Sequence, residues 1–190
     1  MKKILLFIIF LWVIAFLTGC GENGNHTLDP SEGKINGQIK TNLSGHQTIE
    51  LIAREKTLPS NFDEMAYQRS EVPYFQYLVR KAEDQSEFED TWNLYEFEAQ
   101  MPSVNFDKKD IIFIGEHESG SCPAEIDHIK LKSENESMTI YTKVVGGADA
   151  CTDDATPITF VIQMSKEVSN DLKDIIVAES KVETSVPFEN

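Results

Sequence analysis

The stretch Ile111-Ile112-Phe113-Ile114 is an unbroken apolar run of strand length. A strand with one face in water alternates apolar and polar residues, whereas a strand covered on both faces is apolar throughout. We therefore predict that residues 111–114 form a strand in the middle of a sheet, with both of its faces covered.

A helix is predicted shortly before this strand, at residues 86–99. Ser86 and Glu89 have the spacing of a capping box, in which each side chain accepts a hydrogen bond from the backbone of the other residue. Pro102 sets the end of the segment. The apolar residues recur with helical period and form one stripe, which consists of Phe88, Trp92, Tyr95 and Ala99.

Further strands are predicted from alternating patterns bounded by turn residues. They lie at residues 48–54, 73–80, 125–132, 138–145, 158–164 and 174–179, the last as an edge strand. Residues 125–132 and 138–145 form a hairpin around a polar turn. Ile126 is out of phase with Ile129 and Leu131, and a bulge near Asp127 and His128 would restore the phase.

These elements predict an α+β fold. We expect an antiparallel sheet of about five to six strands, with the helix of residues 86–99 packed on one face. Three aromatic residues within residues 74–77 fit core packing or a binding platform, and the first is the commoner use.

The N-terminus has the order of a secretory signal. Met1-Lys2-Lys3 precedes an apolar run at residues 4–17, which is short for a membrane span of roughly 20 residues. Leu17-Thr18-Gly19-Cys20 resembles the lipobox of bacterial lipoproteins. This resemblance implies that residues 1–19 are removed and that Cys20 carries the lipid. The alternatives are an uncleaved anchor and an ordinary secreted protein.

The remaining chain divides into a tether, one domain and a tail. Residues 20–45 contain few large apolar side chains and predict a flexible tether. Residues 46–180 predict a single domain, and residues 181–190 a loose tail. Without Lys2 and Lys3, 15 basic side chains face 32 acidic ones, a net charge of −17. Nucleic acid is a poor partner for a surface with this charge, so none is expected, and anionic lipid headgroups would repel the domain.

Cys122 and Cys151 are the two cysteines that remain once Cys20 is lipidated. Outside the cell, an even pair favours a disulfide, which would close a loop of 30 residues and contribute about 3.6 kcal/mol. The alternatives are a thiol nucleophile and two metal ligands, although the sequence has no Cys-x-x-Cys.

A disulfide at these positions would hold a loop at residues 116–123 beside a loop at residues 146–156. We predict that the carboxylates of the two loops form an acidic rim that captures a basic protein partner. The rim would consist of Glu116, Glu118, Asp149, Asp153 and Asp154. The alternatives are an ordinary solvated surface and a calcium site at the three aspartates.

Catalytic motifs are missing from the sequence. It contains no Gly-x-Ser-x-Gly, no His-Glu-x-x-His and no EF-hand loop. His117 lies between two glutamates, but adjacent residues on an extended segment point apart, and His128 is expected at a bulge. We therefore predict no catalytic residues, no metal and no cofactor.

The order of elements in residues 73–166 resembles the C-terminal domain of PrcB-type lipoproteins, which are accessory subunits of bacterial surface protease complexes. The resemblance rests on the Phe88/Trp92 helix, on Val104-Asn105-Phe106 before the apolar strand, and on Thr159-Phe160-Val161-Ile162. It implies a fold but carries over no functional residues. Where that family has a Gly-Gly-aromatic turn, this chain has Ser119-Gly120-Ser121-Cys122-Pro123.

Together these observations predict a non-enzymatic binding or accessory module that is anchored in the cell membrane through Cys20 and faces outward. Its expected partners are the lipid bilayer and a surface or secreted protein. The alternatives are a metal-dependent or hydrolytic envelope enzyme and a structural envelope lipoprotein.

Overall fold

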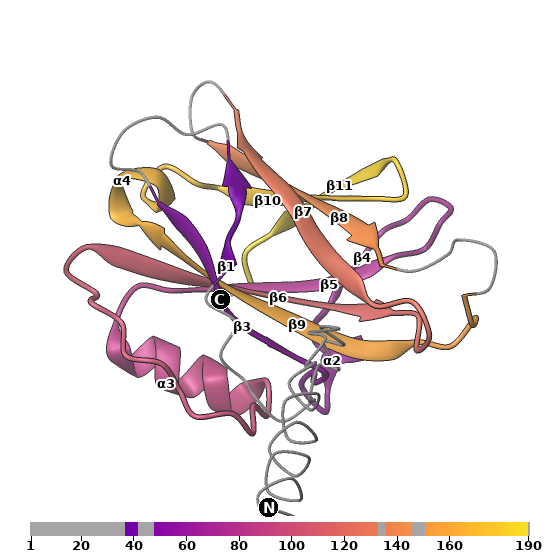
Figure 1. Cartoon of the computed structure of the whole chain (residues 1–190), viewed down its shortest axis with the longest axis horizontal. Coiled ribbons are helices and arrows are strands. Elements are labelled where there is room, and N and C mark those ends of the chain that lie inside the picture. Colours follow the sequence, from indigo (N-terminus) through magenta and orange to yellow (C-terminus); the bar gives the residue numbers. More distant parts are fainter. Residues whose placement is uncertain (1–36, 42–47, 133–135, 146–150, 190) are drawn as a thin grey trace, which may run out of the picture. The chain divides into compact units, whose positions relative to one another are not determined.

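A computed structural model describes residues 37–41, 48–132, 136–145 and 151–189. The predicted signal, the lipidation site Cys20 and most of the predicted tether lie outside these residues. Two sheets make up the described chain (Figure 1). The first sheet has the order β1 (Gly37–Gln38), β3 (Ile49–Glu55), β9 (Thr156–Ser165), β6 (Lys109–Glu118), β5 (Gln76–Ala82), β4 (Tyr67–Gln68).

The second sheet has the order β11 (Val182–Pro187), β10 (Asp174–Glu179), β8 (Ser137–Val144), β7 (Ala124–Leu131), β2 (Lys40–Thr41). The helices are α2 (Phe62–Met65), α3 (Gln85–Leu94) and α4 (Lys166–Ser169). Every predicted strand is present, and the largest difference is that β6 continues to Glu118.

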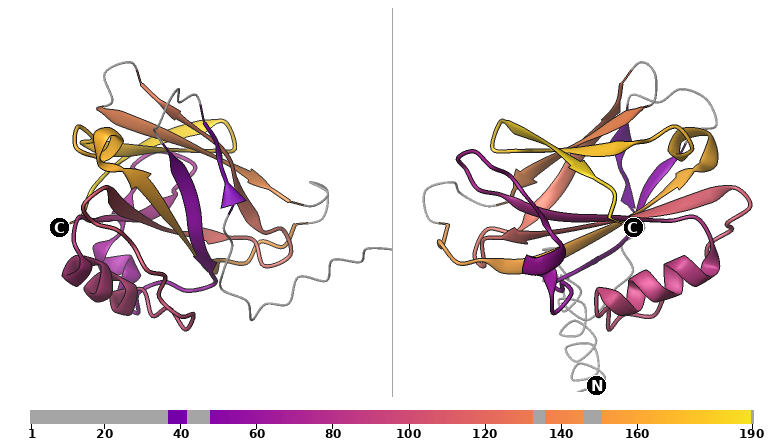
Figure 2. Two further views of the ribbon diagram at one scale, coloured as in Figure 1. Left: turned by 60° about the vertical axis from the view of Figure 1, so that its left-hand side comes forward. Right: turned by 180° about the vertical axis from the view of Figure 1, so that it is seen from behind.

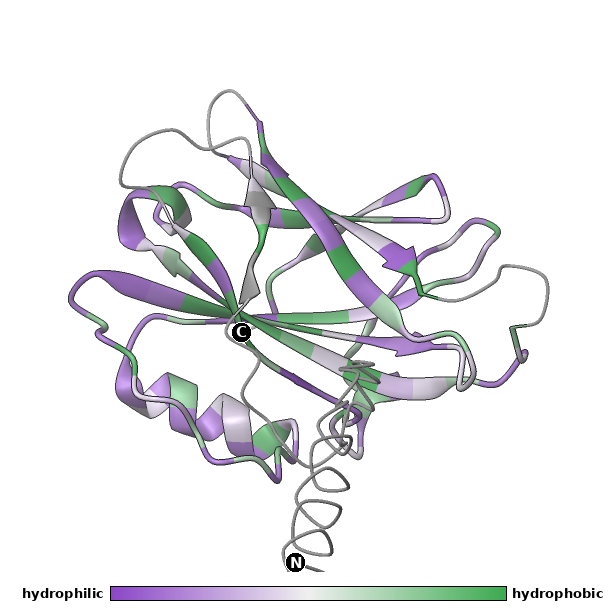
Figure 3. Ribbon diagram, in the orientation of Figure 1, coloured by the Kyte–Doolittle hydropathy of each residue, from purple (hydrophilic) through white to green (hydrophobic). Residues whose placement is uncertain are grey.

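The apolar run of β6 lies between two layers, as predicted. β6 pairs with β9 on one side and with β5 on the other. Ile112 and Ile114 belong to a core that the second sheet shares, and Ile111 and Phe113 to a core on the opposite face. Figure 3 shows hydrophobic residues along the centre of this sheet. Because β6 is apolar on both faces, its side chains pack into the cores on both sides of the first sheet.

The fold contains both helices and sheets, but the prediction of a single sheet is wrong. The strands after β6 divide, since β9 joins the first sheet whereas β7, β8 and β10 form the second (Figure 2). β10 also lies parallel to β8, and it is not an edge strand because β11 follows it. An alternating pattern determines which face of a strand is buried but not which strand it pairs with.

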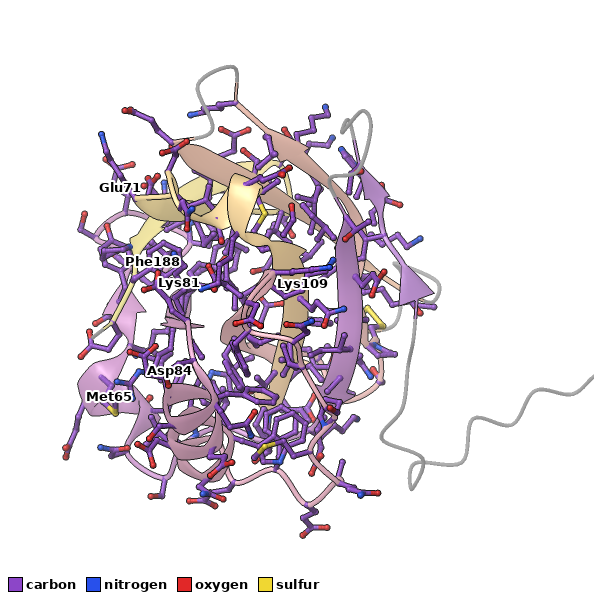
Figure 4. The ribbon with its side chains drawn as sticks, turned by 90° about the vertical axis from the view of Figure 1, so that its left-hand side faces the viewer. Met65, Glu71, Lys81, Asp84, Lys109 and Phe188 are labelled. Carbon is purple, nitrogen blue, oxygen red and sulfur yellow. A yellow bond between two sulfur atoms is a disulfide. The ribbon has the colours of Figure 1, made fainter. Side chains whose placement is uncertain are left out.

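Helix α3 packs against the first sheet through the first part of its predicted stripe, but it ends at Leu94, so the prediction that it continues to Ala99 is wrong. Phe88, Trp92 and Tyr95 are buried there. The predicted Ser86 cap is wrong, because Asp84 is the N-cap and its side chain accepts a hydrogen bond from the Glu87 N–H at 2.9 Å. Figure 4 shows Asp84 at the start of the helix. Asp84 and Glu87 have the same spacing as Ser86 and Glu89, so the pattern fitted both registers.

Gly115 allows the segments around α3 to approach β6 closely. A Cβ atom at this position would lie 2.5 Å from Leu58 Cδ2 and 3.0 Å from Tyr95 Cε1. The Tyr95 hydroxyl donates a hydrogen bond to the Leu78 carbonyl at 2.9 Å, on the neighbouring strand. The sheet and the helix therefore meet at a position that tolerates only glycine without rearrangement.

Both ends of the predicted domain extend further than expected. β1 and β2 lie within residues 20–45, where a tether was predicted, and pair with β3 and β7. The prediction of a loose tail is also wrong, since β11 pairs along β10 and buries Val186.

The predicted bulge is confirmed between Ile126 and His128. Among the helices in the described ranges, none has the length and apolar character of a membrane span.

Candidate functional site

The predicted disulfide is present at one end of the two sheets. Cys122 and Cys151 are bonded, with their Cα atoms 5.4 Å apart. Ser119 Oγ donates to the Thr152 carbonyl at 2.8 Å, and the Thr152 N–H donates to Ser121 Oγ at 2.8 Å. The bridge thus holds residues 119–122 beside residues 151–154, as the sequence predicted.

Asp154 is part of this clamp and is not a free surface charge. Its Oδ1 accepts a hydrogen bond from the Gly120 N–H at 2.9 Å. The hydrogen bond from the Thr152 hydroxyl lowers the pKa of Asp154 most, and the one from the Gly120 N–H lowers it further. Asp153 is exposed, as predicted. Asp149 lies outside the described residues.

Two members of the predicted acidic rim are not at the surface. Glu116 and Glu118 belong to β6, pair with Ile158 and Thr156 of β9, and are 2% and 5% exposed. The prediction that they lie in an exposed loop is therefore wrong. The strand continues past its apolar run, and its charged end lies under the second sheet.

Glu118 is neutralised by a basic side chain. Arg54 Nη2 lies 2.9 Å from Glu118 Oε2, and Lys56 Nζ lies 3.8 Å from Oε1. The Ala124 N–H also donates to Oε2 at 2.7 Å. Arg54 donates in addition to the Ala124 carbonyl at 3.1 Å. This ion pair therefore ties β3 and β6 of the first sheet to β7 of the second.

Glu116 has no such neutralisation. Its Oε2 is buried and has no hydrogen-bond partner among the described residues. Burial raises the pKa of Glu116 well above its ordinary value, and the nearby Glu179 and Glu118 raise it further, while Arg54 lowers it. A buried carboxyl group next to like charges favours its protonated form.

Tyr77, which is buried, and Glu179, which is half-buried, complete this group from the two sheets. The Tyr77 hydroxyl, on β5, donates to Glu179 Oε2, on β10, at 2.9 Å. Burial raises the pKa of Glu179, and the bond from Tyr77 opposes that rise. We name Tyr77, Glu116 and Glu179 the acid cluster. Its signal in the sequence is the continued alternation of Ile112, Ile114, Glu116 and Glu118.

The opposite end of β6 offers a contrast. Asp110 is fully buried, but Lys166 Nζ lies 3.0 Å from its Oδ1 and Lys81 Nζ lies 3.8 Å from its Oδ2. The Ser169 hydroxyl also donates to Oδ2. The same face of one strand thus carries a compensated carboxylate at its start and an uncompensated carboxyl group near its end.

The hairpin of β4 and β5, residues 67–77, exposes large apolar side chains. Tyr67, Val72 and Tyr74 are 41%, 74% and 65% exposed, and they are three of the five exposed large hydrophobic residues in the described ranges. Arg69 braces this hairpin, since its guanidinium donates to the Pro73 carbonyl at 3.1 Å and to that of Glu71. Within the aromatic run at residues 74–77, Tyr77 lies in the core and Tyr74 lies at the surface.

His117 and His128 both lie in strands, in β6 and β7 respectively. Because His117 is in β6, its predicted placement in a loop is wrong. The centroid of its ring lies 5.1 Å from that of the Phe62 ring. His128 lies at the bulge, as predicted, and its ring stacks on that of Tyr141 with the two centroids 4.2 Å apart. Within the ranges that the structure describes, no three His, Cys, Asp or Glu side chains are placed to hold a metal ion.

A comparison with known proteins finds no family model, no curated protein and no solved structure that matches this chain. The resemblance to PrcB-type lipoproteins therefore stays a prediction.

Proposed function

We propose that this chain is a lipid-anchored module on the outer side of a cell membrane, where it binds a protein partner without catalysing a reaction. The anchor is assigned to Cys20 because of the lipobox-like sequence around it. The bond between Cys122 and Cys151 supports this assignment, since it accounts for the other two cysteines and suits an oxidising compartment.

The observation that carries the binding function is the braced hairpin of residues 67–77. Soluble domains rarely gather large exposed apolar side chains on one short element unless the element makes a contact. Tyrosine is enriched at the centres of protein interfaces, where it buries a large area and loses little conformational freedom. Because Arg69 holds the loop in shape, binding would cost little additional ordering.

The partner that fits this surface is a protein with an apolar recess and basic residues around it. Asp63, Glu64 and Glu71 are exposed on the hairpin and on the adjacent α2. The net charge of −17 after removal of the signal, from 15 basic and 32 acidic side chains, would steer such a partner toward the module. The same charge disfavours an anionic bilayer surface.

The test compares exposed apolar residues at two places. Val72→Ser with Tyr74→Ser should abolish chemical crosslinking of the full chain to its partner in native membranes. Val144→Ser removes an exposed apolar side chain from β8 and should leave the crosslink unchanged. Both variants should keep the wild-type thermal midpoint, because the three side chains are mostly exposed.

An unchanged crosslink in the Val72→Ser, Tyr74→Ser variant would overturn the proposal. Loss of membrane attachment in that variant while Cys20 remains lipidated would also overturn it, because the hairpin would then bind the bilayer.

A further inference from the structure

Strand β4 leaves one side of its backbone without a partner. It is the last strand of the first sheet (Figure 1), and it pairs with β5 at Tyr67 and Gln68. The Arg69 N–H donates to the Phe75 carbonyl of the same hairpin at 2.9 Å, so the backbone groups of Arg69 point toward β5. Successive residues of an antiparallel strand alternate between the two sides. The N–H and the carbonyl of Gln68 therefore point away from β5.

The free backbone groups of this edge continue to Ala66. Ala66 is extended, with φ −66° and ψ 137°, so its carbonyl points to the same side as the backbone groups of Gln68, two residues further on. In the described chain, neither the Gln68 N–H nor these two carbonyls has a hydrogen-bond partner. Gln68 and Tyr67 are both exposed, so the edge is open to solvent.

The other sheet edges in the described chain are bridged by the chain itself. β1 and β2 belong to one segment, residues 37–41, which pairs with β3 of the first sheet and with β7 of the second. β11 leads into Glu189, whose N–H donates to the Val79 carbonyl of β5 at 2.8 Å. Proteins commonly protect an edge strand with lysine or proline, and residues 66–70 contain neither. The β4 edge is therefore suited to accept a further strand.

We propose that an extended segment of the protein partner adds to the first sheet as a further antiparallel strand along β4. This inference rests on the proposed function, since it describes how the partner meets the hairpin of residues 67–77. One partner residue exchanges two backbone hydrogen bonds with Gln68, and the residue two positions later donates its N–H to the Ala66 carbonyl. The backbone of the added strand thus supplies the hydrogen bonds, and its side chains supply the specificity.

The side chains around this edge define the chemistry of the added strand. Tyr67 lies opposite the residue that follows the one paired with Gln68, and its exposed ring favours an apolar β-branched neighbour. Exposed acids lie on both sides, Asp63 and Glu64 before β4 and Glu71 after it. The segment that fits has apolar residues at its centre and Lys or Arg at both ends. A second copy of this chain fits poorly, because it brings the same acids to the edge.

The experiment titrates the full chain, purified from membranes in a non-ionic detergent, with the peptide acetyl-Lys-Val-Thr-Val-Arg-amide. We expect a dissociation constant of about 1 mM or below when the central Thr lies opposite Gln68. Methylation of the Thr nitrogen removes the N–H that donates to the Gln68 carbonyl and should weaken binding by at least about tenfold. Methylation of the second Val nitrogen, whose N–H points away from β4, should change binding by less than about threefold.

A charge-reversed peptide tests the flanking acids. Acetyl-Glu-Val-Thr-Val-Glu-amide keeps the apolar centre and the backbone, and at low salt it should bind at least about tenfold more weakly than the basic peptide. Equal binding of the acidic and basic peptides would overturn the assignment of a basic segment.

Two variants of Gln68 test the same hydrogen bonds from the other side. Gln68→Pro removes the outward N–H, leaves the bonds between β4 and β5 in place, and should weaken the unmodified peptide by at least about tenfold. Gln68→Ala keeps that N–H and should bind like wild type. The thermal midpoint shows whether each variant is folded, and if the proline disrupts the hairpin, the two methylated peptides on the wild-type chain decide.

The proposal is overturned by equal binding of the two methylated peptides, by equal binding to a folded Gln68→Pro variant, or by no binding of the unmodified peptide. A wild-type dimer that Gln68→Pro dissociates would assign the edge to a second copy and also overturn it. The Val72→Ser, Tyr74→Ser variant tests the proposed function separately, because it leaves residues 66–68 in place. Loss of its crosslink with equal binding of the methylated peptides would retain the hairpin as the binding surface and overturn strand addition alone.

Discussion

Glu116 and Asp110 show how the surroundings of a single residue determine its charge in this protein. Both are buried on the same face of β6. Asp110 has Lys166 and Lys81 beside it, whereas Glu116 has Glu179 and Glu118. A buried carboxylate without a cation is costly, so the Glu116 carboxyl group keeps its proton above the pH at which an exposed glutamate loses it.

This difference predicts a pH dependence of stability. The unfolded chain ionises Glu116 near its ordinary pKa of 4.5, whereas the folded chain does so at a higher pH. Between the two values the folded state binds more protons, so its stability is full below the lower pKa and falls as pH rises through the higher one. The slope is at most about 1.4 kcal/mol per pH unit.

Glu116→Gln should remove this contribution. Urea unfolding at about pH 5 and pH 8 should show the variant gaining stability relative to wild type at the higher pH. Glu183→Gln, at an exposed position on β11, should show no such change. A wild-type minus Glu116→Gln difference that is constant with pH would contradict the protonation of Glu116.

At the scale of the element, α3 is followed by a residue with an unfavourable backbone conformation, one position after its C-cap Tyr95. Glu96 has φ 57°, its N–H donates to the Asn93 carbonyl at 3.0 Å, and the Phe97 N–H donates to the Trp92 carbonyl at 3.3 Å. The Trp92 and Phe97 rings stack at 4.3 Å. These bonds define a Schellman motif, in which glycine is the preferred residue at the left-handed position.

Glu96→Gly should therefore stabilise the domain by about 0.5–1 kcal/mol. The same substitution at Glu89, which is exposed in the interior of α3, should destabilise it by about 1 kcal/mol. Thermal unfolding of the two variants separates the cases. A loss of stability in Glu96→Gly would show that the left-handed conformation does not govern the end of α3.

The elements also show what the sequence can and cannot predict. Periodicity located the strands, the stripe of α3 and the bulge at His128, because each depends only on neighbouring residues. It did not predict the second sheet, because strand pairing depends on contacts between distant residues. For the same reason it placed Glu116 and Glu118 in a loop, since glutamates at the end of a strand look like solvated residues until a layer covers them.

At the scale of the whole molecule, the three cysteines are assigned two independent tasks. The Cys122–Cys151 bond joins two loops of the folded domain, and Cys20 is proposed to anchor the chain in the membrane. Replacing Cys122 and Cys151 with Ala should lower the free energy of unfolding by about 3–4 kcal/mol and leave lipid attachment intact.

Cys20→Ala should produce the opposite pattern. An unprocessed precursor without lipid should accumulate, while the domain keeps its urea midpoint. Mass spectrometry and urea titration of both variants provide the check. A processed, membrane-held Cys20→Ala protein would contradict the anchor, and free thiols at Cys122 and Cys151 in the wild-type protein would contradict the bridge.

The measurement that tests the central claim most directly is site-specific photo-crosslinking in intact cells. A benzophenone amino acid at position 74 lies on the hairpin, and one at position 183 lies at an exposed site on β11. We predict a discrete protein adduct from position 74 and none from position 183. The absence of a protein adduct at position 74, or the same adduct from both positions, would contradict the assignment of this hairpin as the partner-binding surface.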